Sequence, residues 1–323
     1  MSQTSVQPKA IPSSASLSHL RARDRAGWVV TCAAVAISAS GLWLSLGESF
    51  WLWALGQVVL ALALLQWFVI LHEAGHNTLF RTRRLNRLAG HLASVFALIP
   101  FFNWQRIHAR HHKYTGWQDL DATTALLVPR TIKRWERRVM NFAWATGLPL
   151  FSVLYRVQNF WNLPRVERYL ERAEDARVAR LNAWSLGLLY AIGTAAIGPV
   201  ALLTIVGAGL LLSLMAQDLI LLSQHTHMPS NLSHGAPVRP FPPQQQEQFT
   251  RSLRLPEWLS RFLLRFDLHE LHHMYVHVPG YDLHRIPYAA QNEVNWLDWT
   301  REAKQLSGTT FLFGSREQTG FNR

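Results

Sequence analysis

The sequence predicts an all-α integral membrane protein, with four transmembrane helices in two hairpins and a cytoplasmic helical cap that carries clusters of histidines. Three observations predict this fold: the composition, the apolar runs and the placement of the basic residues. The 323 residues are 49% hydrophobic and only 16% charged, whereas soluble domains carry roughly 25% charged residues. Low charge with many aromatic residues is typical of a membrane protein.

The first predicted hairpin comprises spans at about 27–46 and 51–71, neither of which contains a charged residue. Each run is close to the roughly 20 helical residues that cross a bilayer core. The link between them is short. Trp43, Trp51 and Trp53 lie near this turn, as expected of an interfacial aromatic belt.

The second predicted hairpin lies within residues 184–222, an apolar block that is too long for one span. Gly198 and Pro199 interrupt it near the middle, and this pair favours a break in a helix. We therefore expect spans at about 184–200 and 202–222.

The basic residues predict the orientation. All 32 Lys and Arg lie in segments 1–26, 72–182 and 223–323, which the positive-inside rule places in the cytoplasm. We expect a multi-pass protein of the bacterial inner membrane with both termini cytoplasmic. The net charge of +12 fits a face that anionic lipid headgroups attract, and we do not expect nucleic-acid binding.

The predicted organisation is a disordered tail over 1–26, a membrane domain over 27–300 and a C-terminal tail over 301–323. Residues 89–102 are apolar but too short for a span, so we expect a re-entrant or interfacial segment. Residues 131–182 mix Arg and Glu with Trp, Tyr and Leu. They fit amphipathic helices on the membrane surface and solvated helices equally well.

Four histidine clusters lie outside the predicted spans, in the segments that we place in the cytoplasm. Residues three and four apart share one face of a helix, and three of the clusters have that spacing. Each of these three can aim its imidazoles at one point, which predicts a metal site. The four clusters comprise His72 and His76; His108, His111 and His112; His225 and His227; and His269, His272 and His273. The third of these, His225 and His227, lacks the helical spacing.

The side chains available as ligands limit which metals this chain can bind. A single cysteine, Cys32, excludes thiolate clusters, and imidazole suits iron, zinc and copper. The first cluster also reads H-E-x-x-H, with Glu73 in the place of a zinc protease's general base. That alternative leaves the other clusters without a role. A non-catalytic metal-binding or lipid-binding membrane protein is a further alternative.

The clusters read HEAGH at 72–76, HARHH at 108–112, QHTH at 224–227 and HELHH at 269–273. This set resembles the histidine boxes of the membrane fatty-acid desaturase superfamily and is closest to those of plant-type oleate desaturases. The resemblance covers about residues 27–285. It implies desaturation of a fatty acyl chain at two iron ions with dioxygen as co-substrate; hydroxylase, ketolase and acetylenase are the alternatives within the superfamily.

The resemblance also implies nine histidine ligands, eight from the boxes and one from the fourth element. We assign the ninth to His225, which directly follows the last span, with His227 as its competitor. Some relatives carry an Asn four residues before this histidine, where this chain has Leu221. The implied ligands are His72, His76, His108, His111, His112, His225, His269, His272 and His273.

Nine neutral ligands leave two irons highly charged, so we expect carboxylates to accept the outer imidazole protons. Glu73 and Asp218 are the preferred candidates; Asp218 lies seven residues before His225 and so shares its helix face. Glu270 is a further candidate. Asp119 and Asp121 fit either this role or helix capping.

The electrons must come from outside the chain, because the sequence has no cysteine set, no GxGxxG and no cytochrome b5 motif. We expect a ferredoxin-type or cytochrome-type donor, and a basic cytoplasmic face could dock such an acidic carrier. The other expected partners are the fatty acyl substrate and membrane lipids.

Overall fold

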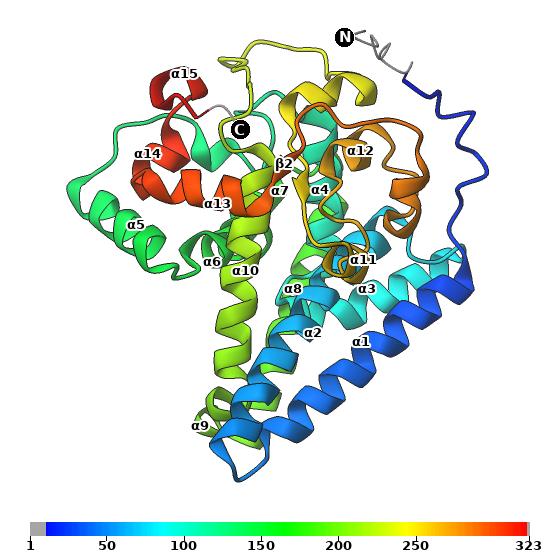
Figure 1. The fold of residues 1–323 in the computed structure, drawn as a ribbon, viewed down its shortest axis with the longest axis vertical. Helices are drawn as coiled ribbons and strands as arrows, with labels where there is room; N and C mark the ends of the chain where they lie inside the picture. Colours follow the sequence, from blue (N-terminus) through cyan, green and yellow to red (C-terminus); the bar gives the residue numbers. More distant parts are fainter. Residues whose placement is uncertain (1–10, 322–323) are drawn as a thin grey trace, which may run out of the picture.

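The computed structural model describes residues 11–321; residues 1–10 and 322–323 lie outside this part of the chain. Long helices extend from a cap of short helices, and the first and last described residues both lie at the cap end (Figure 1). Three helical stretches in the described chain are long and apolar enough to cross a membrane: Asp24–Ser45, Phe50–His76 and Pro199–His225. A fourth crossing is possible if one bent helix pair counts as a span.

Helices α1 (Asp24–Ser45) and α2 (Phe50–His76) form the first hairpin. They approach closely near the turn, where a Cβ on Gly56 would lie 2.6 Å from the backbone nitrogen of Ser45. Gln57 links this hairpin to the second one, since its Nε2 donates to Ser45 Oγ and to the carbonyl of Ile205. Helix α2 continues beyond the predicted end at 71 and so carries the first histidine cluster.

The second hairpin begins with α8 (Asp175–Ile197) and breaks at Gly198, whose φ is 89°. The chain continues through α9 (Pro199–Leu202), the π-helical turn η3 (Leu203–Gly207) and α10 (Ala208–His225). Helix α8 contains most of the predicted span 184–200 but starts in a charged segment. It is not among the three stretches that are apolar enough to cross a membrane.

Helices α3 (Arg83–Ala97) and α4 (Phe101–Tyr114) form the bent pair, with an angle of 97° between them. The predicted re-entrant or interfacial segment 89–102 falls on this bend. Leu98 takes a left-handed φ of 58°, and Pro100 is the capping residue directly before α4. Because of the bend, α4 returns toward the end of α2 and carries the second histidine cluster to the first.

The cap is built from short elements and a two-stranded parallel sheet in which β1 pairs with β2. Figure 1 shows α5 and α6 on one side of α10 and α11 and α12 on the other. The elements are η1 (Ala125–Leu127), α5 (Arg134–Thr146), α6 (Leu150–Arg156), η2 (Val157–Trp161), α7 (Leu163–Arg168), η4 (Pro243–Phe249), β1 (Leu253–Arg254), α11 (Glu257–Phe262), α12 (His269–Met274), η5 (Gly280–Arg285), β2 (Val294–Asn295), α13 (Trp296–Gln305), α14 (Gly308–Phe313) and α15 (Arg316–Thr319).

The predicted tails pack against the cap wherever the structure describes them. Leu17 and Leu20 are buried in one apolar cluster with Leu271 and Tyr275 around α12. At the other end, Phe311 is fully buried and stacks on Trp144 of α5. Apolar side chains in both segments leave water on folding, which stabilises the packed state. The first ten residues of the N-terminal tail lie outside the described chain.

Candidate metal centre

Four elements bring the histidines together at the cap end of the long helices. Helix α2 carries the first cluster on its last turns, α4 carries the second and α12 carries the late cluster. His225 is the last residue of α10. The predicted helical spacing is therefore present in all three box clusters, and the side chains face one volume.

The structure divides eight of the nine predicted ligands into two groups of four. Within each group, one ligand atom per residue lies within 4.8 Å of all the others. The ninth, His112, contacts both groups: its Nε2 lies 3.1 Å from Nε2 of His108 and of His272 in the first, and its ring centroid lies 4.3 Å from that of His273 in the second. The groups are His72, His76, His108 and His272, and His111, His225, His269 and His273.

The chemistry of these nitrogens fits metal ions. His269 Nε2 lies 2.9 Å from His225 Nε2, and His111 Nε2 lies 3.2 Å from His273 Nε2. Two neutral imidazoles can share one proton across such a gap, but clusters of four cannot satisfy every pair in this way. Nε2 of His72 and of His76 is buried with no hydrogen-bond partner among the described residues. Buried polar atoms without partners are rare, and a coordinated cation would satisfy them.

Burial keeps the imidazoles of the late cluster neutral. It lowers the pKa of His269, His272 and His273 well below the usual histidine value, and the other nearby imidazoles lower it further. A neutral imidazole offers a lone pair to a metal, whereas a protonated one does not.

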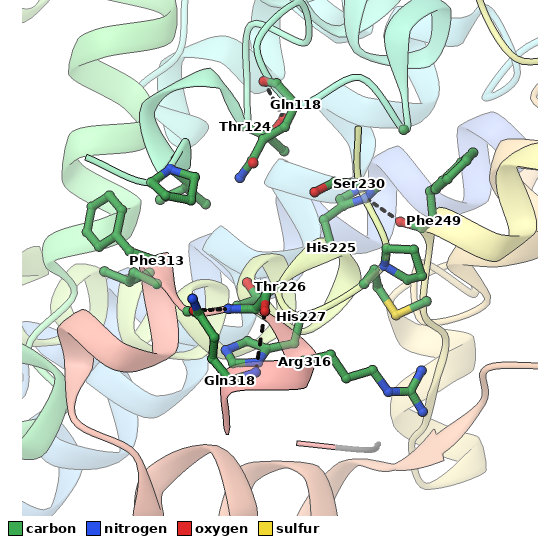
Figure 2. Close-up of a pocket in the computed structure, with 18 of the residues that line it drawn as sticks. Gln118, Thr124, His225, Thr226, His227, Ser230, Phe249, Phe313, Arg316 and Gln318 are labelled. Carbon is green, nitrogen blue, oxygen red and sulfur yellow. Dashed lines mark hydrogen bonds between the residues drawn. The ribbon is translucent and has the colours of Figure 1, made fainter. Parts of the chain in front are cut away.

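Outer hydrogen bonds turn several lone pairs inward. His111 Nδ1 donates to Asp121 Oδ2 at 2.7 Å, and His72 Nδ1 donates to Glu73 Oε1 at 3.1 Å. His225 Nδ1 donates to the carbonyl oxygen of Phe249 at 3.2 Å (Figure 2). A histidine that donates from Nδ1 presents its Nε2 lone pair to the metal.

Asp121 is the best placed of these carboxylates. It is almost fully buried and also accepts hydrogen bonds from Thr123. Burial raises its pKa, but the electrostatic interaction with His111 and the hydrogen bond from that ring outweigh burial and bring the pKa to about 2. Asp121 is therefore ionised, and of the two roles predicted for it the structure favours the one beside a histidine.

The structure does not bring Asp218 to a histidine. Its carboxylate accepts a hydrogen bond from the backbone N–H of Ser152 on α6. Seven residues of α-helix rise about 10 Å, so Asp218 shares a face with His225 but lies two turns away along α10. The prediction rested on the helix face that the two residues share. It did not take their separation along the helix axis into account.

The other candidate acids bind backbone. Asp119 accepts from the backbone of Ser233 and His234. Glu270 accepts from the backbone of Ser252 and Asn292, and burial raises its pKa to about 7. Neither carboxylate contacts a box histidine through a hydrogen bond in the described chain.

His227 lies apart from both groups. Its Nε2 donates to the carbonyl of Phe311 at 2.8 Å, and its Nδ1 accepts from Thr319 Oγ1 at 3.0 Å. Both ring nitrogens are thus occupied within the C-terminal segment. This geometry favours His225 as the ninth ligand.

Gln246 is a residue of the site that sequence reasoning missed. Its Oε1 lies 2.9 Å from His273 Nδ1, and its Nε2 donates to the carbonyl of His112. Gln246 lies in a run of three glutamines, and nothing in that run distinguishes it. Only the fold of η4 onto α12 identifies it.

A cavity of about 50 Å³ lies against the histidines. Phe68, Phe151, Tyr155 and Leu221 give it apolar walls, and members of both histidine groups line it. Leu221 occupies the position where some superfamily members carry Asn. The site thus combines two candidate metal positions with an apolar surface suited to an alkyl chain.

A helical protein with three or four membrane-crossing candidates and a paired histidine site belongs to a recognisable class, the membrane histidine-box oxidoreductases. Residues 48–300 match the fatty acid desaturase family model. The chain belongs to the fatty acid desaturase family and is an oxidoreductase. Family membership sets aside the zinc-protease and non-catalytic alternatives.

The curated relatives are distant in sequence, but their matches extend over most of this chain. "Probable fatty acid desaturase DES1" of Sorghum bicolor is 24% identical over 284 residues, which cover 83% of this chain and 70% of the relative. A cyanobacterial "sn-1 oleoyl-lipid 12-desaturase" (Picosynechococcus sp.) is 26% identical over 257 residues, or 73% and 68% of the two chains. The "sn-2 acyl-lipid omega-3 desaturase (ferredoxin), chloroplastic" of Helianthus annuus is 24% identical over 264 residues, and the match spans 76% of this chain but only 56% of that relative.

Proposed function

We propose that this protein desaturates a fatty acyl chain in an oxygen-dependent reaction at two irons held by the nine histidines. The observation that carries this proposal is the pair of four-imidazole groups, with His112 in contact with both, beside an apolar cavity. Nine nitrogen ligands exceed the four that a single zinc takes. Divided between two ions, they give four or five per ion.

The chain's own residues would hold and orient the substrate. Bound iron would supply the power to remove hydrogen from unactivated methylenes, with dioxygen as co-substrate. Phe68, Phe151 and Tyr155 would hold the alkyl chain in a fixed place, which decides the carbons that react. Asp121 would keep a proton on His111 Nδ1 and so keep Nε2 directed inward.

An external donor completes the balance of electrons. Reducing dioxygen to two waters takes four electrons, and forming one double bond releases two. The other two must be supplied, and we propose a carrier of the ferredoxin or cytochrome type. One relative is named as a ferredoxin-dependent enzyme, which supports this choice.

We also propose the membrane arrangement expected from the sequence: four spans in a domain over 27–300, with the histidine cap and both termini in the cytoplasm of a bacterial inner membrane. The absence of Lys and Arg from 27–71 and 183–222 supports it. Hydroxylase, ketolase and acetylenase outcomes are not favoured, because the relatives above are all named as desaturases.

Expression in a host of known lipid composition, followed by lipid profiling, tests this function. We expect new double bonds with the natural chain and with His234→Ala, an exposed histidine outside both groups. We expect none with His111→Ala. New double bonds in the His111→Ala host would contradict the proposal, and so would their absence with a natural chain that holds its metal.

A further inference from the structure

The first turns of α1 and α3 lie beside each other. Asp24, the first residue of α1, accepts hydrogen bonds from the residue directly before α3, Thr82, whose backbone nitrogen lies at 3.0 Å and whose Oγ1 lies at 2.8 Å. One turn further along α1, Trp28 packs edge-on against Phe80 with ring centroids 5.4 Å apart. Figure 1 shows both helices starting on the same side of the molecule. Two segments that are far apart in the sequence therefore form one surface, here called the α1–α3 junction.

Five arginines gather at the α1–α3 junction, and in the described chain none of them forms an ion pair with a carboxylate. Exposed arginines elsewhere do pair, as Arg254 does with Glu293 and Arg261 with Glu257, each at 2.7 Å. Residues 80–92 contain no acid, and Asp24 is already bound by Thr82. The five exposed arginines are Arg25, Arg81, Arg83, Arg84 and Arg87.

Buried contacts hold the backbone beneath these arginines in place. Asn86 is fully buried; its Oδ1 accepts from the backbone N–H of Phe80 at 3.0 Å, and its Nδ2 donates to the carbonyl of Phe80 at 2.7 Å. Gly27 allows the ring of Phe80 to lie against α1, because a Cβ there would fall 2.5 Å from the ring. A surface that is ordered before binding loses less conformational entropy when a ligand binds. The arginines at 81–84 therefore belong to a preorganised turn.

Large apolar side chains lie beside these charges on the exposed face. Leu88 and Leu92 follow Arg84 at intervals of four residues, so the three share one side of α3. Leu88 is 63% exposed, and Trp28 on α1 is 48% exposed. Basic residues next to exposed leucine and tryptophan are typical of a helix at the boundary between lipid headgroups and acyl chains. Because α1 continues from here as a candidate membrane crossing, the junction favours a lipid partner over a soluble one.

We propose that the α1–α3 junction binds the headgroup of an anionic phospholipid, with the arginines on its phosphate and with Trp28 and Leu88 against the upper part of its acyl chains. Guanidinium groups bind phosphate through paired N–H donors. Clusters of about four to eight basic residues directly beside a membrane-spanning helix are typical sites for anionic lipids. This inference rests on the proposed membrane arrangement and is independent of the proposed reaction.

Photochemical labelling tests the site on the full-length, metal-loaded protein in phosphatidylcholine nanodiscs. The probe is a phosphatidylglycerol that carries a diazirine beside its phosphate. We expect the label on residues 25–28 and 81–92, identified by mass spectrometry of the digested chain. Label confined to other surfaces, or no label, would overturn the proposal. Labelling needs no turnover, so this test and the lipid-profiling test of the proposed function fail separately.

Competition distinguishes an anionic lipid from other partners. Unlabelled phosphatidylglycerol in the nanodiscs should suppress the labelling, whereas additional phosphatidylcholine or free inorganic phosphate should not. Equal suppression by phosphatidylcholine would show that the junction has no preference for anionic lipid, and suppression by inorganic phosphate would show a site for the free anion; either result would contradict the proposal. A plant-type ferredoxin is the remaining competitor. If it suppresses the labelling and phosphatidylglycerol does not, the arginines dock an acidic protein and the lipid proposal is wrong.

Replacing Arg83, Arg84 and Arg87 together tests the role of charge. With glutamine at all three positions we expect phosphatidylglycerol to bind about 100-fold more weakly, since each basic residue near an anionic lipid surface contributes about fivefold. Lysine at the same positions keeps the charge and should retain most of the binding. Undiminished labelling of the glutamine variant, or equal losses in the glutamine and lysine variants, would contradict the role of charge.

The matched control removes the same charge elsewhere on the cap. Arg254→Gln, Arg261→Gln and Arg301→Gln, combined in one chain, change three exposed arginines that each have a carboxylate partner. We expect labelling of residues 81–92 as in the natural chain. A loss equal to that of the junction variant would show that overall charge, and not this surface, binds the lipid. The metal content of each variant shows whether the fold is intact, and the position of the site is decided on the natural chain alone.

Discussion

A single hydrogen bond to Nδ1 determines which ring nitrogen of a histidine presents its lone pair to a metal. Where Nδ1 donates to a carboxylate or a carbonyl, as in His72, His111 and His225, the Nε2 lone pair faces the interior of the site. These outer partners orient the rings and strengthen them as ligands. The consequences of losing one partner can therefore be tested separately from the loss of a ligand.

Asp121→Asn should weaken metal binding without removing a ligand. The substitution keeps the shape of the side chain but removes the charge 2.7 Å from His111 Nδ1. Loss of such a partner typically costs about 10-fold to 100-fold in metal affinity. Competition with a chelator measures the affinity of the purified protein. Asp119→Asn, at a loop-binding carboxylate, is the control and should show little change; equal losses in both would refute the role of Asp121.

His225→Ala and His227→Ala should differ in metal content. His225 lies in the second group of four imidazoles, whereas both ring nitrogens of His227 are bound by Phe311 and Thr319. We expect His225→Ala to lose iron and His227→Ala to keep it. Losing the hydrogen bonds of His227 should instead lower stability, by about 1–3 kcal/mol. Iron loss in His227→Ala alone would reverse the assignment.

Spacing within the chain was enough to predict which histidines share a helix face in three of the clusters, because three-residue and four-residue intervals place side chains on one face. The choice of His225 came from the family resemblance. Spacing could not reveal Gln246, which reaches His273 only through the fold of η4. It also placed Asp218 on the correct face but too far along α10 to reach His225. Partners that meet through tertiary packing leave no signal in local spacing.

Between helices, close packing of α2 against α4 holds the first two clusters in register. Gly75 lies between His72 and His76, and a Cβ there would overlap the ring of Trp104. Trp104 in turn stacks on His108, with ring centroids 4.2 Å apart. The glycine therefore allows the approach that joins two ligand clusters.

Gly75→Ala should separate these helices. Overpacking of a buried contact typically costs about 1–3 kcal/mol, and the shift of Trp104 would move His108 away from His72. We expect a lower melting temperature together with reduced iron content. Gly193→Ala in α8 is the control, because a Cβ there meets nothing within 4 Å, and alanine favours a helix by about 0.5–1 kcal/mol. If Gly75→Ala kept its iron and stability, the close approach would not matter.

Helix boundaries were predicted well where composition changes sharply. The starts and ends of α1 and the start of α2 lie within a few residues of the predicted spans. The 97° bend between α3 and α4 and the packing of the C-terminal segment on α5 were not predictable in detail. Both depend on contacts between distant parts of the chain, such as Phe311 with Trp144.

For the molecule as a whole, the three basic segments should lie on one side of the membrane. Cys32 is the only cysteine, so a Cys32→Ser background allows single-cysteine labelling. Ser49→Cys lies in the turn after α1 and Gln245→Cys lies in the cap, and both positions are exposed. In intact cells, an impermeant maleimide should label the first but not the second. Labelling of both positions from outside would contradict the proposed topology.

The most direct test of the central claim is the metal content of the purified, active protein, measured by elemental analysis. Imidazoles from α2, α4, α10 and α12 converge in two neighbouring groups, so we expect two irons per chain. His272→Ala and His273→Ala, which remove one ligand from each group, should each lower that number. A preparation that forms double bonds while holding one zinc per chain would contradict the account.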